Sequence, residues 1–196
     1  VLDFVSVNQK DNPRKDHRLT LHHMGYFADE MADQIAKMGV EASVNPYYLW
    51  ALADKYATNG LGQARAENLV ALNSLAKRNV TTSYHSDFAM APMEPLTLAW
   101  TAINRVTSGN KKVSQDQRVD IYTAMKAITI SAAETLNLEH KIGSIEAGKT
   151  ANFTILKQNP FKVEPITIKN IDVLGTVHKG IFYINKTANL KPVPLS

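Results

Sequence analysis

The sequence predicts an α/β protein in which parallel strands alternate with helices and a smaller antiparallel sheet follows. Short β-rich runs alternate with helical patterns three times in the first part of the chain. The order strand, loop, helix, strand is typical of parallel βα units with right-handed crossovers. From about residue 142, strand-like runs with Gly, Asn and Pro turns replace the helices.

The first unit begins with the run LTLHH at residues 19–23, which has the composition of a short strand. A helix is expected from Ala28, because Met31, Ile35 and Met38 recur at the spacing of one helical face. These three side chains are therefore expected to point towards the sheet.

The second unit begins with VEASVN at residues 40–45, and the helix AENLVALNSLAKR is expected at residues 66–78. The third begins at residues 80–86 and is followed by a helix from about Pro95 to Thr107, where proline suits the first turn. Two shorter helices are expected at 116–126 and 131–136.

The change in character near residue 140 divides the chain into a βα part, residues 1–140, and a β part, residues 141–196. Three βα units cannot close a barrel, because a (β/α)₈ barrel needs eight strands. The pattern alone leaves two architectures open. One is a small doubly wound domain with a β tail, and the other is the last part of a larger barrel.

Composition excludes several classes of function. The net charge is +4, but the cations are scattered without the aromatic interleaving of a nucleic-acid groove. No run has the length of a membrane span, and the first residues lack the layout of a signal peptide, so we expect a cytoplasmic protein. The chain has no Cys, so any metal must be bound by His and carboxylate side chains.

Polar side chains gather where the three expected strands end. His22 and His23 end the first strand, Asn45 ends the second, and His85 and Asp87 follow the third. Barrels and open parallel sheets both place their active sites at the carboxyl ends of the strands. Each residue also has a structural interpretation, as a hydrogen-bonded strand-end His or as a turn Asp. From the residues alone, the pattern indicates a site without deciding its chemistry.

Several segments, in order, resemble the amidohydrolase superfamily, in the branch that includes N-substituted formamide deformylase. The resemblance lies in NPRKDHRLTLHH, KMGVEASVNP, SDFAMAPMEPLTLAWTAINRVT, KAITISAAETLNLEHKIGSIEAGKTANFTIL and VHKGIFYIN. It covers most of the chain and implies the C-terminal part of a metal-dependent hydrolase. The implied fold is strands six to eight of a (β/α)₈ TIM barrel plus part of a small β-sandwich. The first residues resemble the helix after the fifth barrel strand.

The resemblance also implies roles for individual residues. His23 matches the metal ligand on the sixth strand, while His22 takes the position of a usual Glu, which leaves the choice between the two histidines slightly open. Asp87 matches the eighth-strand Asp, a metal ligand that also takes a proton from the attacking water. Asn45, Tyr48 and His85 are expected on the substrate side. The implied cofactor is a divalent metal, with zinc preferred and manganese or iron left open.

The function implied is hydrolysis of a C–N bond in an amide-type small molecule by metal-activated water. The chain alone is expected to be inactive, because the family's other metal ligands lie on earlier barrel strands. Its expected partner is then the missing N-terminal half of the barrel or another copy of itself. The alternative is a non-catalytic module, or a truncated paralogue, that acts by associating with another chain.

Overall fold

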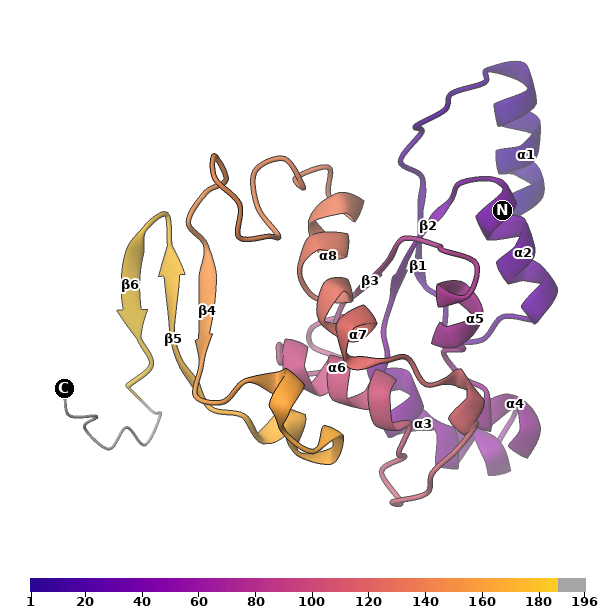
Figure 1. Cartoon of the computed structure of the whole chain (residues 1–196). Coiled ribbons are helices and arrows are strands. Elements are labelled where there is room, and N and C mark those ends of the chain that lie inside the picture. Colours follow the sequence, from indigo (N-terminus) through magenta and orange to yellow (C-terminus); the bar gives the residue numbers. More distant parts are fainter. Residues whose placement is uncertain (187–196) are drawn as a thin grey trace.

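The computed structural model describes residues 1–186, which contain two three-stranded sheets with most helices around the first (Figure 1). The first sheet consists of β1 (Thr20–His23), β2 (Glu41–Val44) and β3 (Thr82–Tyr84), parallel and in that order. The predicted α/β class and the parallel βα units are therefore confirmed. β1 and β3 are the edge strands of this sheet.

Helices connect the strands and continue after β3. None of those in the described residues is both long and apolar enough to span a bilayer. The α-helices are α1 (Leu2–Asp11), α2 (Asp29–Lys37), α3 (Tyr47–Thr58), α4 (Gln63–Glu67), α5 (Leu72–Ala76), α6 (Pro95–Asn104), α7 (Ile121–Ala127) and α8 (Ile130–Thr135). Three 3₁₀ turns are η1 (Gln115–Gln117), η2 (Pro160–Lys162) and η3 (Pro165–Asn170).

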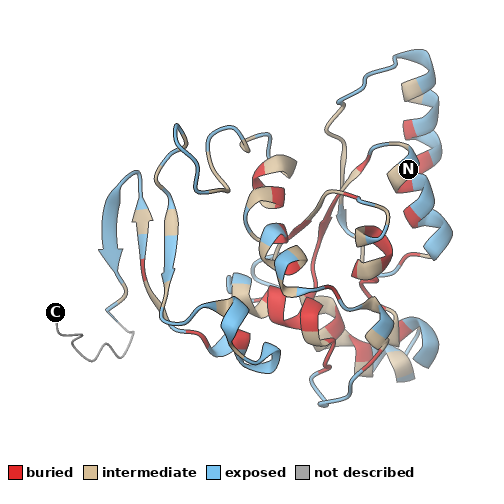
Figure 2. Ribbon diagram, in the orientation of Figure 1, coloured by how far each residue is buried: buried red, intermediate tan, exposed pale blue. Residues whose placement is uncertain are grey.

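The core lies between the first sheet and the surrounding helices, and Figure 2 shows α6 as one of its most buried elements. Helix α2 contributes Ala32 and Ile35, both 0% exposed. The prediction that Ile35 points towards the core is confirmed. The same prediction for Met31 is wrong, because Met31 is 43% exposed. The buried stripe is therefore displaced from Met31 towards Ala32.

The helix predicted at residues 66–78 is broken in the structure. α4 ends at Glu67 and α5 begins at Leu72, and between them Val70 has a left-handed φ of 52°. The N–H of Leu72 donates to the carbonyl of Val70, which closes a tight turn where the helix would have continued. A β-branched residue rarely adopts a positive φ, so this turn depends on contacts from elsewhere in the fold.

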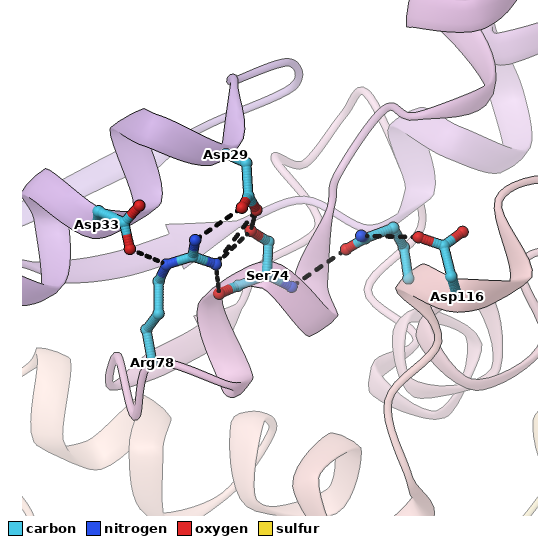
Figure 3. Close-up of polar contacts among 6 residues, drawn as sticks. Asp29, Asp33, Ser74, Arg78 and Asp116 are labelled. Atoms are coloured by element: carbon cyan, nitrogen blue, oxygen red, sulfur yellow. Dashed lines mark hydrogen bonds and ion pairs between the residues drawn. The ribbon is translucent and has the colours of Figure 1, made fainter.

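The cluster Asp29–Asp33–Ser74–Arg78 joins α2 to the α5 region (Figure 3). The guanidinium of Arg78 pairs with Asp29 at 2.7 Å and with Asp33 at 2.6 Å. The Ser74 hydroxyl also donates to Asp29. These contacts hold two helices of neighbouring βα units side by side at the surface.

The second sheet consists of β4 (Phe153–Leu156), β5 (Val173–His178) and β6 (Ile181–Ile184), antiparallel and in that order. The antiparallel element expected near the C-terminal end is therefore present. Lys179 and Gly180, both with positive φ, form the two-residue turn between β5 and β6 that suits the twist of a hairpin.

The 3₁₀ turn η3 ties this C-terminal region to α6. The indole N–H of Trp100 donates to the carbonyl of Ile166 at 2.8 Å, and Lys169 Nζ lies 3.8 Å from the centre of the Trp100 ring. Ile168, from the part expected to be separate, is 1% exposed and belongs to the main core. The two parts of the chain therefore share packing, and their division at residue 140 stays a prediction.

Candidate active site

Parallel register brings the carboxyl ends of the first three strands to one edge of the sheet. His23 is aligned with Val44, and Val44 with Tyr84, so the residues after β2 and β3 emerge beside His23. His22 is aligned with Ser43 instead. The site residues expected from the sequence therefore come from three consecutive strand ends, separated along the chain by two helical connections.

Tyr48 joins His23 to Asp87. The phenol donates to Asp87 Oδ2 at 3.1 Å, and Nδ1 of His23 lies 3.0 Å from the same phenol oxygen. Because the phenol has a single proton, its oxygen accepts from Nδ1–H of His23, which leaves the lone pair on Nε2 of that ring. Nδ1 of His23 lies 3.7 Å from Asp87 Oδ2. Among the five predicted residues, these three form a connected group.

Burial raises the pKa of Tyr48, and its hydrogen bond to Asp87 raises it further. The phenol therefore keeps its proton at neutral pH and remains a donor. The side chains of His23 and Asp87 are 53% and 41% exposed, so this part of the site is open to solvent. Because the imidazole and the carboxylate are exposed and the phenol orients them, a substrate or water molecule from solvent can reach this part of the site.

His85 lies next to this group and is more enclosed. Its ring centroid is 5.0 Å from that of His23, in an edge-on arrangement, and its Nε2 is buried without a hydrogen-bond partner in the described chain. Burial lowers the pKa of His85, the adjacent His23 lowers it further, and Asp87 opposes both. A neutral imidazole with a buried, unpartnered nitrogen is an unusual feature, because such groups normally have a partner.

Asn45 is 0% exposed and links two loops of the site. Its Nδ2 donates to the carbonyl of Ser86 at 3.2 Å, and its Oδ1 accepts from the N–H of Tyr47 at 3.0 Å. These bonds hold the residue before Asp87 and the first turn of α3, which carries Tyr48. The structure therefore shows that Asn45 positions two segments of the site through hydrogen bonds. Its contact with substrate stays a prediction.

Two of the site residues have left-handed backbone conformations. His23 has φ 71°, the following Met24 has φ 45°, and Asp87 has φ 52°. Positive φ is uncommon outside glycine, costs on the order of 1 kcal/mol or more, and is concentrated at functional sites. The backbone thus turns sharply at the two residues whose side chains approach each other.

The donor atoms suit a borderline metal such as zinc, which binds imidazole nitrogen and carboxylate oxygen. His23 Nε2 and Asp87 could each supply one ligand. Within residues 1–186, however, no three or more His, Asp or Glu side chains are grouped so that they could enclose a metal ion. The arrangement offers part of a metal site.

A sequence profile described as the Amidohydrolase family matches residues 1–182. The chain belongs to this family. N-substituted formamide deformylase of Arthrobacter pascens is 26% identical over 195 residues, which are 96% of this chain and 35% of that protein. Protein LONG AFTER FAR-RED 3 of Arabidopsis thaliana is 31% identical over 161 residues, 81% of this chain and 27% of that protein. The chain thus spans about a third of the length of these relatives.

Solved structures of amidohydrolases, which are TIM-barrel enzymes, have the same fold over most of this chain. An uncharacterised metal-dependent hydrolase from Pyrococcus horikoshii OT3 has a TM-score of 0.66 at 22% identity, over 83% of this chain and 32% of its own. An adenosine deaminase from Xanthomonas campestris with bound zinc has a TM-score of 0.62 at 18% identity, over 92% of this chain and 42% of its own. These likenesses show that the fold of this chain is shared with those two proteins.

Sequence reasoning placed Tyr48 near substrate but did not predict that it bridges His23 and Asp87. That contact requires α3 to begin directly after Pro46, so that Tyr48 lies in the first helical turn. The run YYLWALA is apolar or aromatic throughout, so it shows no helical periodicity from which this helix could be predicted. The polar hydroxyl of a Tyr close behind a strand end was the available signal.

Proposed function

We propose that this chain is the C-terminal part of a metal-dependent amidohydrolase that hydrolyses a C–N bond in an amide-type small molecule. Residues 1–140 would supply barrel strands six to eight, and residues 141–196 the last strands of the β-sandwich. The observation that carries the proposal is the His23–Tyr48–Asp87 group at the carboxyl edge of a parallel sheet in a family member. Similarity to a formamide deformylase favours the amide-type bond.

The residues would divide the chemistry as follows. His23 through Nε2 and Asp87 through its carboxylate would hold the metal, which when bound lowers the pKa of a water ligand and polarises a carbonyl. The Asp87 carboxylate accepts the proton of the attacking water and delivers it to the leaving nitrogen. Tyr48 keeps that carboxylate oriented by its hydrogen bond at 3.1 Å. Asn45 and His85 line the substrate side.

The remaining ligands would come from a preceding barrel half. Zinc in catalytic sites takes three protein ligands, and His23 with Asp87 gives fewer. β1 is an edge strand, and its outer backbone groups have no strand partner in the described part of the chain. A strand from the missing half, or from a second copy of this chain, would satisfy them. We therefore expect residues 1–196 alone not to turn over substrate.

The experiment measures zinc binding by calorimetry and hydrolysis of formamide-type substrates for residues 1–196. His23→Ala and Asp87→Asn are expected to abolish a weak zinc affinity, and His178→Ala, on the second sheet, is the matched control that retains it. Equal binding by all variants would contradict the metal roles. Substrate turnover by the wild-type chain that Asp87→Asn abolishes would contradict the expected inactivity of the fragment.

A non-catalytic module is the second candidate, because the described residues group no complete metal site. Such a module, or a truncated paralogue, would act by associating with another chain. Light scattering after gel filtration distinguishes the cases. A stable monomer without bound metal would count against barrel completion by a second chain, whereas a defined oligomer that binds zinc would support it.

A further inference from the structure

Arg105 is a buried cation outside the group described above. It directly follows α6 as the C-cap residue and is 1% exposed, and within the described residues its guanidinium donates only to main-chain carbonyls. Nε donates to Val113 at 3.2 Å, Nη1 to Val70 at 2.7 Å, and Nη2 to Glu67 and Leu69 at 2.9 Å each. Burial lowers the pKa of Arg105 to about 10, so the side chain remains charged at neutral pH.

Of these four carbonyls, that of Glu67 belongs to the last residue of α4, and those of Leu69 and Val70 lie in the break between α4 and α5. A buried charge is costly unless its hydrogen bonds are made, so the guanidinium requires the carbonyls of Glu67, Leu69 and Val70 to converge on it. That convergence is compatible with the left-handed φ of 52° at Val70 and with the end of α4 at Glu67. A helix through residues 66–78 would point its carbonyls along the helix axis instead.

The Val70 turn also contacts the loop that follows His23, the last residue of β1. The N–H of Val70 donates to the carbonyl of Gly25 at 2.8 Å, two residues after His23. The Gly25 backbone also faces Tyr48, because a methyl group added at Gly25 would lie 3.5 Å from Cδ2 of that ring. The left-handed residues His23 and Met24 lie directly before Gly25. The loop is held at its start by the pairing of β1 with β2 and at Gly25 by the hydrogen bond from Val70.

We propose that Arg105 is a positioning residue for the His23–Tyr48–Asp87 group and acts through the Val70 turn and Gly25. The inference rests on the proposed function, since it assigns Arg105 to that same site. A strained loop keeps its conformation only when surrounding contacts determine it. Arg105 supplies the interaction that holds Val70 in a left-handed conformation, and Val70 holds Gly25. The charge of the guanidinium makes these bonds stronger than neutral ones.

The test uses nitrogen-15-labelled residues 1–196 without metal and measures two signals. The first is hydrogen exchange of the Val70 amide, with the Ala42 amide, bonded to Thr81 at 2.9 Å, as the core reference. The second is the imidazole spectrum of His23, which reports the bond between its Nδ1 and Tyr48. In the wild-type chain, Val70 should exchange only by global unfolding, like Ala42. Exchange of Val70 by a faster local opening would overturn the proposal.

Arg105→Lys keeps the charge and loses the fork of donors. It is expected to lower the protection of Val70 by about tenfold relative to Ala42, the scale of one hydrogen bond to a charged group. It should also shift the His23 imidazole signals. Trp100→Phe is the matched control on the same helix, because it loses a bond to η3 and should leave both signals unchanged.

Val70→Gly in the Arg105→Lys background is the rescue variant, because glycine adopts a positive φ without strain. It should return the His23 signals towards those of the wild type, although it removes a buried side chain. If Arg105→Lys lowers only the overall stability and leaves the His23 signals unchanged, the proposal is overturned. If Arg105→Lys does not fold, the wild-type exchange rate of Val70 still decides. These signals are read without metal, so a failure to bind zinc would reject the proposed function alone.

Discussion

Helix α2 allows a quantitative test of which of its faces covers the sheet. Ile35 is 0% exposed, so Ile35→Ala removes buried carbons worth roughly 0.8 kcal/mol each, or about 2.5 kcal/mol in total. The cavity left behind adds on the order of 1 kcal/mol, which gives a loss of about 3.5 kcal/mol. Met31 is 43% exposed, and alanine favours the helix, so Met31→Ala should cost less than about 1 kcal/mol.

The assay is urea unfolding followed by far-ultraviolet circular dichroism, with equal slopes required before free energies of unfolding are compared. The two substitutions remove side chains of similar size from one helix, so their effects on helix propensity and on the unfolded state largely cancel when the two free-energy changes are compared. A cost for Met31→Ala as large as that for Ile35→Ala would refute the orientation of α2. So would a cost for Ile35→Ala below about 1 kcal/mol.

Two further predictions concern ion pairing and the site. Arg78 lowers the pKa of both Asp29 and Asp33, so its stabilisation is present above their ordinary pKa and is lost as the pH falls through the lowered values. In acid titrations followed by circular dichroism, Arg78→Met should therefore unfold at a higher pH than the wild type, and identical curves would contradict this. Tyr48→Phe removes the hydroxyl that orients two proposed metal ligands and should weaken zinc binding by about tenfold in calorimetry, with circular dichroism as the folding control. Unchanged affinity would show that the hydroxyl has no such role.

The strands and their common edge could be predicted because local composition and simple geometry determine them. The runs at residues 19–23, 40–45 and 80–86 each contain a strand, and parallel connections require their ends to meet at one edge. The approach of His23 to Asp87 follows from that geometry together with the family resemblance. The metal, the substrate and the roles of these residues stay predictions.

Contacts that are distant along the chain accompany the break in the helix predicted at residues 66–78. The sequence of residues 66–78 fits a helix, but in the structure the carbonyls of Glu67, Leu69 and Val70 accept from Arg105, which follows Val70 by 35 residues. Tertiary contacts here override local propensity. A lone charge within the run LAWTAINRVT, which has no other ionisable residue, was the signal that this Arg is buried and needs acceptors.

The contact between Trp100 and η3 gives the chain an intrinsic optical reporter. Trp100 is 3% exposed, its indole N–H is bonded to Ile166, and the ammonium of Lys169 lies over its ring. Release of η3 from α6 would hydrate this indole and shift its fluorescence emission to the red. Because the chain has a second tryptophan, Trp50, detachment of the C-terminal sheet can be followed without a label in a Trp50→Phe variant, separately from the loss of helix that circular dichroism records.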